Sequence, residues 1–145
     1  MSIISEVGEA IENVISSASL SLTPDSVAFA HLPQERLSEI GTNLNVHVVP
    51  SGLVEERGNR SQFRTEVSFT VSIEKGLGGN TNALIDPMLD YEEEVRAELK
   101  GRLTTASNLD CIFQSAEVVE VTDYASMHTD GIFVNLTRYT YRVLS

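Results

Sequence analysis

The sequence has only one cysteine, Cys111, among its 145 residues. A single cysteine excludes a disulfide within the chain. Cys111 stands in the short apolar stretch CIF, which is typical of a small buried residue. A catalytic thiolate needs a histidine and a third orienting group, and no spacing in the sequence suggests them. We therefore expect Cys111 to be a core residue rather than a nucleophile.

Long apolar runs and a basic leader segment are also missing. No stretch approaches the roughly 18 apolar residues that a membrane-spanning helix needs. The first residues, MSIISEVGEAIENV, are acidic where a secretory signal would be basic, so we expect no export signal. The composition, 41% hydrophobic and 21% charged, is ordinary for a globular chain. We expect one domain over residues 1–145 and no association with a membrane.

Basic residues are scarce, because 10 Lys and Arg stand against 21 Asp and Glu and give a net charge of −11. An acidic surface repels phosphate, which disfavours binding to duplex DNA through counterion release. The carboxylates of DYEEEVRAE follow one another on a predicted helix and therefore spread around its axis. Paired acid–base catalysis needs two carboxylates that converge on one point. We interpret this run as a solvated helix face.

The stretch QFRTEVSFTVSIEKG, residues 62–76, has the clearest pattern in the chain. Its odd-numbered positions are mainly apolar and its even-numbered positions are polar, a period of two that predicts a long strand. Further strands are predicted over 43–49, 111–121 and 132–144. Residues 50–61 are polar and contain two glycines, so we predict a loop that joins two antiparallel strands.

Two segments leave alternatives open. Residues 27–30 read as a short strand, followed by a loop or helical turn through Leu37 and Ile40. In the last strand the apolar residues change phase between Leu136 and Tyr139. This change predicts either a bulge or a strand that is covered on different faces at its two ends.

Two helices are predicted from apolar residues at helical spacing. The first covers residues 2–18, with Ser2 as its N-cap. The second begins at Asp86-Pro87 and runs to Leu103, with acidic residues early and basic residues late, as the helix dipole favours. The element order is α-β-β-α-β-β. The predicted fold class is α+β, an antiparallel sheet of about four long strands with helices packed on one face.

Two short motifs are weak signals. The glycines of GLGG, residues 76–79, lack the lysine and hydroxyl residue of a phosphate-binding loop. Of the three histidines, only His128 has acidic neighbours, Asp123 and Asp130, in one predicted loop. We interpret that cluster as a polar turn rather than a metal site. We predict no catalytic, cofactor-binding or metal-binding residue.

Arginines gather near the predicted 50–61 loop and along the last strand. In an acidic chain, localised arginines are candidates for recognising carboxylates of a partner or of a second copy. Two tyrosines beside the later arginines favour an interface, and scattered surface charge is the alternative. The candidate subunit or partner interface comprises Leu53, Arg57, Arg60, Arg64, Arg138, Tyr139, Tyr141 and Arg142.

The combined pattern resembles the tail-terminator (tail-completion) proteins of tailed bacteriophages. The matching features are the N-terminal amphipathic helix, the strand pair ending in FRTEVSFTVSIEKG, the helix IDPMLDYEEEVRAELKGRL and the final strand IFVNLTRYTYRVL. The resemblance covers nearly the whole chain and rests on patterns rather than on a fingerprint. The segment 20–42 departs from it.

The resemblance implies a structural virion protein that is not an enzyme and needs no cofactor. It implies a homo-oligomeric ring, usually a hexamer, that caps the tail tube. Its partners would be further copies of itself, the tail tube protein and the head–tail connector or stopper protein. DNA would pass through the lumen without specific binding, as an acidic lining allows. The protein would reside in the tail or neck of the virion, and in the host cytoplasm during assembly.

Three other interpretations stay open. A head-to-tail connector or stopper ring also uses small mixed α/β subunits. A small enzyme or ligand-binding domain on a ferredoxin-like sandwich would need a pocket with convergent polar groups. A plain interaction module is the third.

Overall fold

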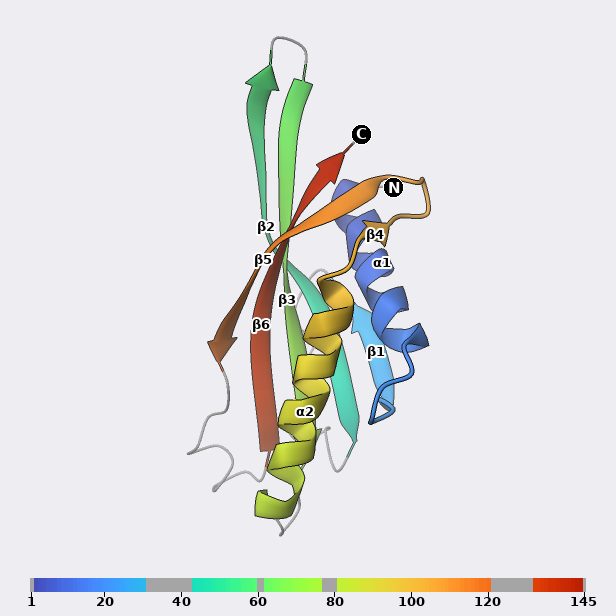
Figure 1. Ribbon diagram of the computed structural model, residues 1–145, viewed down its shortest axis with the longest axis vertical. Helices are drawn as coiled ribbons and strands as arrows, with labels where there is room; N and C mark the ends of the chain where they lie inside the picture. Colours follow the sequence, from blue (N-terminus) through green and yellow to red (C-terminus); the bar gives the residue numbers. More distant parts are fainter. Residues whose placement is uncertain (1, 31–42, 60–61, 77–80, 121–131, 145) are drawn as a thin grey trace.

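The computed structural model describes residues 2–30, 43–59, 62–76, 81–120 and 132–144, which form two helices and six strands (Figure 1). The elements are α1 (Ile3–Ser17), β1 (Ser26–Phe29), β2 (Leu44–Asn59), β3 (Gln62–Gly76), α2 (Thr81–Leu99), β4 (Leu103–Thr104), β5 (Asp110–Glu120) and β6 (Ile132–Leu144).

The strands form one curled sheet in the order β1-β2-β3-β6-β5-β4. β1 pairs parallel to β2, and every other pairing is antiparallel. The predicted fold class, four antiparallel strands in the order α-β-β-α-β-β, is therefore wrong. The short strand read over 27–30 is present as β1, shifted by one residue, whereas β4 has only two residues, too few to show a period of two. The parallel pairing of β1 with β2 depends on contacts that no local pattern encodes.

The predicted loop over 50–61 is also wrong, because β2 continues to Asn59 and pairs with β3 along its length. Register shifts near Gly52 and Asn59 break the alternation that would have predicted a strand. Pro50 is tolerated in the strand because its nitrogen points away from β3. The Ala30 amide donates to the Val48 carbonyl at 3.0 Å, so the backbone polar groups of Val48 point toward the edge where β1 lies. The nitrogen of Pro50, two residues further on, points to the same edge. β1 ends before Pro50, so the missing N–H breaks no ladder bond.

The first helix is confirmed, with small changes at its ends. The Ser5 amide donates to Ser2 Oγ at 3.1 Å, which makes Ser2 the N-cap. The second helix differs more. α2 begins at Thr81, so Pro87 lies inside it instead of at its first turn. It ends at Leu99, and Leu103 belongs to β4.

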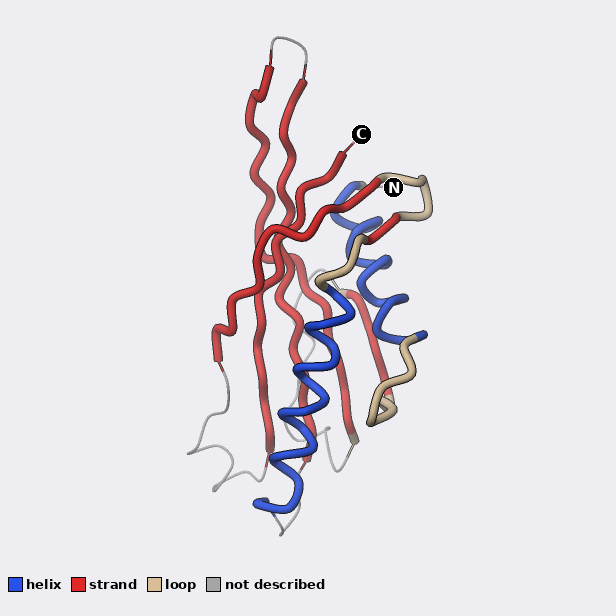
Figure 2. The backbone as a smooth tube through the Cα atoms, in the orientation of Figure 1, coloured by secondary structure: helices blue, strands red, loops and turns tan. Residues whose placement is uncertain are grey.

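Both helices cover the same face of the sheet, and the core lies between the helices and the sheet (Figure 2). From the helices the buried apolar side chains include Val7, Ile11, Ile15, Met88, Tyr91, Val95 and Leu99. From β2, β3 and β6 they include Val46, Val48, Val67, Phe69, Val71, Ile73, Phe133, Tyr139, Tyr141 and Val143. Cys111 is buried as predicted, and burial raises the pKa of its thiol to about 11.

A bulge does not explain the phase change of the last strand, because the β3–β6 pairing runs without a register shift. Alternate residues from Phe133 to Val143 are all buried on the helix-covered face. Two of these, Asn135 and Thr137, are polar, and Val134 and Leu136 are half-buried on the other face. The helix-covered face is therefore buried along the whole strand, and the strand does not change its covered face between its two ends, contrary to the second alternative.

Neither described helix has the length and hydropathy that a membrane span requires. Some predictions fall outside the described residues. These are the helical turn through Leu37 and Ile40, most of the GLGG stretch, and the loop that contains Asp123, His128 and Asp130.

Candidate functional site

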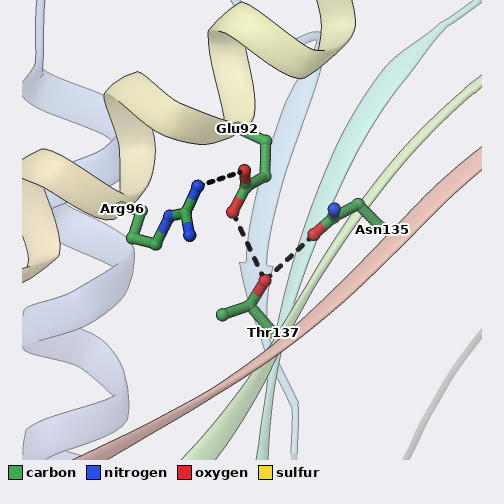
Figure 3. Close-up of polar contacts among 4 residues, drawn as sticks. All are labelled: Glu92, Arg96, Asn135 and Thr137. Atoms are coloured by element: carbon green, nitrogen blue, oxygen red, sulfur yellow. Dashed lines mark hydrogen bonds and ion pairs between the residues drawn. The ribbon is translucent and has the colours of Figure 1, made fainter. Parts of the chain in front are cut away.

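A buried polar cluster joins α2 to β6 (Figure 3). Glu92 Oε2 accepts a hydrogen bond from Arg96 Nη2 at 3.1 Å, and Glu92 Oε1 lies 3.5 Å from Thr137 Oγ1. Thr137 Oγ1 also lies 3.0 Å from Asn135 Oδ1. Because the carboxyl of Glu92 and both β6 side chains are almost fully buried, the cluster fastens the helix to the sheet and presents no chemistry at the surface.

The protonation of Glu92 is linked to this cluster. Burial raises the pKa of the Glu92 carboxyl, and the nearby Arg96 guanidinium opposes that rise. A threonine hydroxyl carries one hydrogen, so Thr137 cannot donate to Glu92 and to Asn135 at the same time. A protonated Glu92 would donate to Thr137 and leave the threonine hydrogen for Asn135. The hydrogen bonds that join α2 to β6 in this cluster therefore depend on the protonation state of Glu92.

Two hollows in the described part of the chain are lined by acidic groups. One of about 650 Å³ lies beside α2 and is lined by Ser21, Leu22, Pro87, Asp90, Glu93, Glu94 and Ala97. The other, of about 300 Å³, lies between α1 and the β4–β5 turn and includes Glu6 and Glu9. No group of three His, Cys, Asp or Glu side chains among the described residues is placed to hold a metal ion.

A third hollow, of about 450 Å³, has the opposite charge. It lies where α2 ends beside β5 and is lined by Lys100, Arg102, Ile112 and Phe113. Arg102 pairs with Asp110 at 3.0 Å and its side chain is 63% exposed. Two cations beside two apolar side chains suit an acidic segment that also carries apolar residues.

The predicted interface residues separate into three groups. Leu53 and Arg138 are exposed, the side chains of Arg57, Arg60 and Arg64 lie outside the described residues, and the others are buried or half-buried. Leu53 lies on β2 and is 44% exposed. Arg57 and Arg64 belong to the outer ends of β2 and β3, although their side chains, and the whole of Arg60, lie outside the described residues. Arg138 is exposed on β6, on the face away from the helices.

The third group is buried or partly buried. Tyr139 and Tyr141 lie beneath the helices and belong to the core of the single subunit, because their β6 positions face α2. Arg142 is half-buried on the other face, and its Nε is a buried atom with no hydrogen-bond partner among the described residues. Their share in an interface between molecules stays a prediction. Burial of the tyrosines could have been foreseen from the phase of Tyr139, Tyr141 and Val143.

Sequence reasoning missed two stretches of sheet edge that no described strand covers. β1 pairs with β2 only as far as Val48, and β4 pairs with β5 only at Asp110 and Cys111. Beyond these points no described strand pairs with the outer edge of β2 or of β5. Unpaired backbone groups on a strand edge are a template for another strand.

The β2–β3 hairpin also extends past the rest of the sheet (Figure 1). β6 pairs with β3 only as far as Thr65, which lies opposite Glu55, so the hairpin beyond this row has two strands alone. A two-stranded hairpin has little stability by itself in water. Near its base, Leu53 and Val54 are 44% and 51% exposed. A hairpin with these properties is suited to contact another molecule.

Comparisons with known proteins show no family for this chain. No protein-family model matches it, and no curated protein matches it. One solved structure, of a protein identified only by a sequence accession number, aligns over 99% of this chain and 94% of its own length. The sequence identity is 14% and the TM-score is 0.48, a likeness that carries no argument about function.

Proposed function

We propose that this protein is a structural subunit of a tailed bacteriophage, which forms a ring that caps the tail tube and joins it to the head connector. The observation that carries the proposal is that, among the described strands, none pairs with the outer edge of β2 beyond Val48 or with the outer edge of β5 beyond Cys111, on opposite sides of one sheet. Two different surfaces that fit one another join copies head to tail, and such contacts close into a ring when the rotation between copies permits it.

Two further features support a ring around DNA. The strands β2 and β3, of 16 and 15 residues, are long and paired along their length, which suits a rigid wall. The net charge of −11 provides few cationic partners for phosphate, so DNA could pass such a ring without adhering. The sequence resemblance to tail-terminator proteins points in the same direction.

The test is negative-stain electron microscopy of the purified protein, alone and mixed with tail tubes polymerised from recombinant tube protein of the same phage. We expect rings with a central hole, either free or seated on one end of each tube, and tubes that stop growing once capped. An unrelated acidic protein of similar size is the control. Tubes that grow unchanged without a cap would refute the proposal. Rings that bind the connector but never the tube would instead identify a connector or stopper ring.

A further inference from the structure

The two free edges cannot meet within one molecule. Between β2 and β5 lie β3 and β6, so three strand spacings separate the two edges. At about 4.8 Å for each spacing, this distance is roughly 14 Å. Any contact between the edge of β2 and the edge of β5 therefore joins two different copies of the chain.

The register places matching residues on the two edges. Read from β2 to β5, two neighbouring rows of the sheet are Leu53–Val67–Tyr141–Phe113 and Val54–Glu66–Arg142–Ile112. Residues in one row lie on the same face of the sheet. Leu53 and Phe113 thus share the helix-covered face, and Val54 and Ile112 share the other face.

Each edge therefore carries one apolar side chain on each face of the sheet. Leu53 and Val54 are exposed, and Ile112 and Phe113 are half-buried beside the basic hollow. A partner that packs against one face would cover only one residue of each pair. A strand that adds to the edge covers both at once.

Charge identifies what fits the β5 edge. Glu55 follows Val54 and is exposed, and its row continues through Thr65 and Val143 to Cys111, the residue that pairs with Leu103 of β4. A copy of β2 laid along β5 would bring Glu55 to the end of β4, beside Arg102 and near Lys100. In a chain with 21 acidic residues, this hollow is a basic place that an acidic strand can recognise.

From these relations we propose that residues 51–54 of β2 add as a strand to residues 112–115 of β5 in a neighbouring copy. Leu53 then packs against Phe113, Val54 packs against Ile112, and Glu55 pairs with Lys100 or Arg102 of that neighbour. This inference deepens the proposed function, on which it rests, by naming the surfaces that join the ring.

The strand directions suit this addition. Three successive antiparallel pairings separate β2 from β5, so the two strands run in opposite directions. A rotation about an axis along the strands preserves direction, so β2 and the neighbour's β5 form an antiparallel ladder. The stretches that pair also lie at the same height in the sheet, because Gly52 shares a row with Ser115 and Val54 shares one with Ile112. Copies at one level close a ring instead of a helix.

The first test is cross-linking with the double variant Val54→Cys/Ile112→Cys. Within one copy the two positions are too far apart for a disulfide, which requires Cα atoms within about 7 Å. Mild oxidation should therefore produce covalent multimers up to the size of the ring on a non-reducing gel. Each single variant, which retains Cys111, is a control and should stay monomeric. A second control, Val54→Cys/Val119→Cys, places the thiol on the same edge but in a different row. Multimers that form equally in this control, or none in the test variant although both thiols react with a maleimide, would overturn the inference.

The second test is a charge exchange, read by sedimentation at several protein concentrations. Glu55→Lys and Lys100→Glu should each weaken association by about fivefold per contact, and the double variant should recover most of the loss. Circular dichroism shows that each variant is folded. Equal losses that add in the double variant would contradict the pairing.

Rings that form without the Val54–Ile112 cross-link would overturn the inference and leave the proposed function standing. Cross-linked rings that never cap a tube would support the inferred contact between copies and refute the proposed function.

Discussion

The phenol of Tyr141 donates a hydrogen bond to the carbonyl oxygen of Leu99 at 2.6 Å. Tyr141 lies on β6 and Leu99 is the last residue of α2, so the bond joins the final strand to the end of a helix. The last carbonyls of a helix have no partner within it, and this one is satisfied by a side chain 42 residues further along the chain. Burial raises the pKa of the Tyr141 phenol, which keeps the donor protonated.

Removing this donor should lower stability. Tyr141→Phe leaves the Leu99 carbonyl buried without its partner, and we expect a loss of about 1–3 kcal/mol in the free energy of unfolding. Urea denaturation followed by circular dichroism measures it. The matched control is Tyr91→Phe, because the Tyr91 hydroxyl is buried and has no hydrogen-bond partner in the described part of the chain. That change should be neutral or stabilising, and equal losses in both variants would show that the Tyr141 bond contributes nothing specific.

The polar cluster of Figure 3 predicts a pH dependence. Burial raises the pKa of Glu92 above its usual 4.5, so the folded state holds this proton more tightly than the unfolded state. The contribution of Glu92 to stability is therefore fully present below about pH 4.5 and is lost as the pH rises through the folded-state pKa.

Glu92→Gln removes this titration while keeping a group that accepts a hydrogen bond from Arg96. We expect the stability of the variant relative to wild type to increase as the pH is raised from 4 to 8. Urea titrations at each pH give the difference between the two proteins, which cancels the other carboxylates. A difference that is constant across this range, or that shrinks as the pH rises, would contradict the raised pKa of Glu92.

A close approach between α1 and β1 predicts an unusual effect of alanine. A Cβ added at Gly8 would overlap the ring of Phe29, which packs edge to face on Phe69 with 6.2 Å between ring centroids. The Phe29 amide also donates to Glu12 Oε2 at 3.0 Å, so β1 is held against the helix and cannot easily retreat. Alanine normally favours a helix over glycine by about 1 kcal/mol.

We therefore expect Gly8→Ala to destabilise the protein by about 1–3 kcal/mol in spite of its helix propensity. In a Phe29→Ala background the same change should be neutral or stabilising, since the ring is gone. Thermal and urea unfolding of the four proteins in this cycle measure the coupling. A stabilising Gly8→Ala in the wild-type background would show that the packing of α1 on β1 is looser than the structure indicates.

The candidate site was only partly foreseeable from the sequence. The arginines and Leu53 of the predicted interface pointed to the hairpin and to the last strand, and Leu53 is indeed exposed. The tyrosines of that prediction lie in the core. The sequence predicted a strand over 111–121, but not that Ile112 and Phe113 would lie at the edge of the sheet. Whether a strand lies at the edge of a sheet depends on which strands pair, and no local pattern records that.

The sequence by itself determined the elements that bury one regular face. α1 with its Ser2 cap, the alternation of β3, and the strands β5 and β6 follow from periods of 3.6 and 2 that need only local residues. Even within β3, however, the polar positions Ser72 and Glu74 are buried, which the alternation alone does not indicate.

Only the tertiary structure decided the remaining features. β1 pairs parallel to β2 although the sequence indicated only a short strand there, and residues 50–59 are a strand because β3 holds them in register through two bulges. Thr137 faces the core beside its polar partner Glu92 of α2, and Asn135 faces the core beside Thr137. These features depend on groups that the chain brings together from far apart, and their energies arise only when the sheet and helices are assembled.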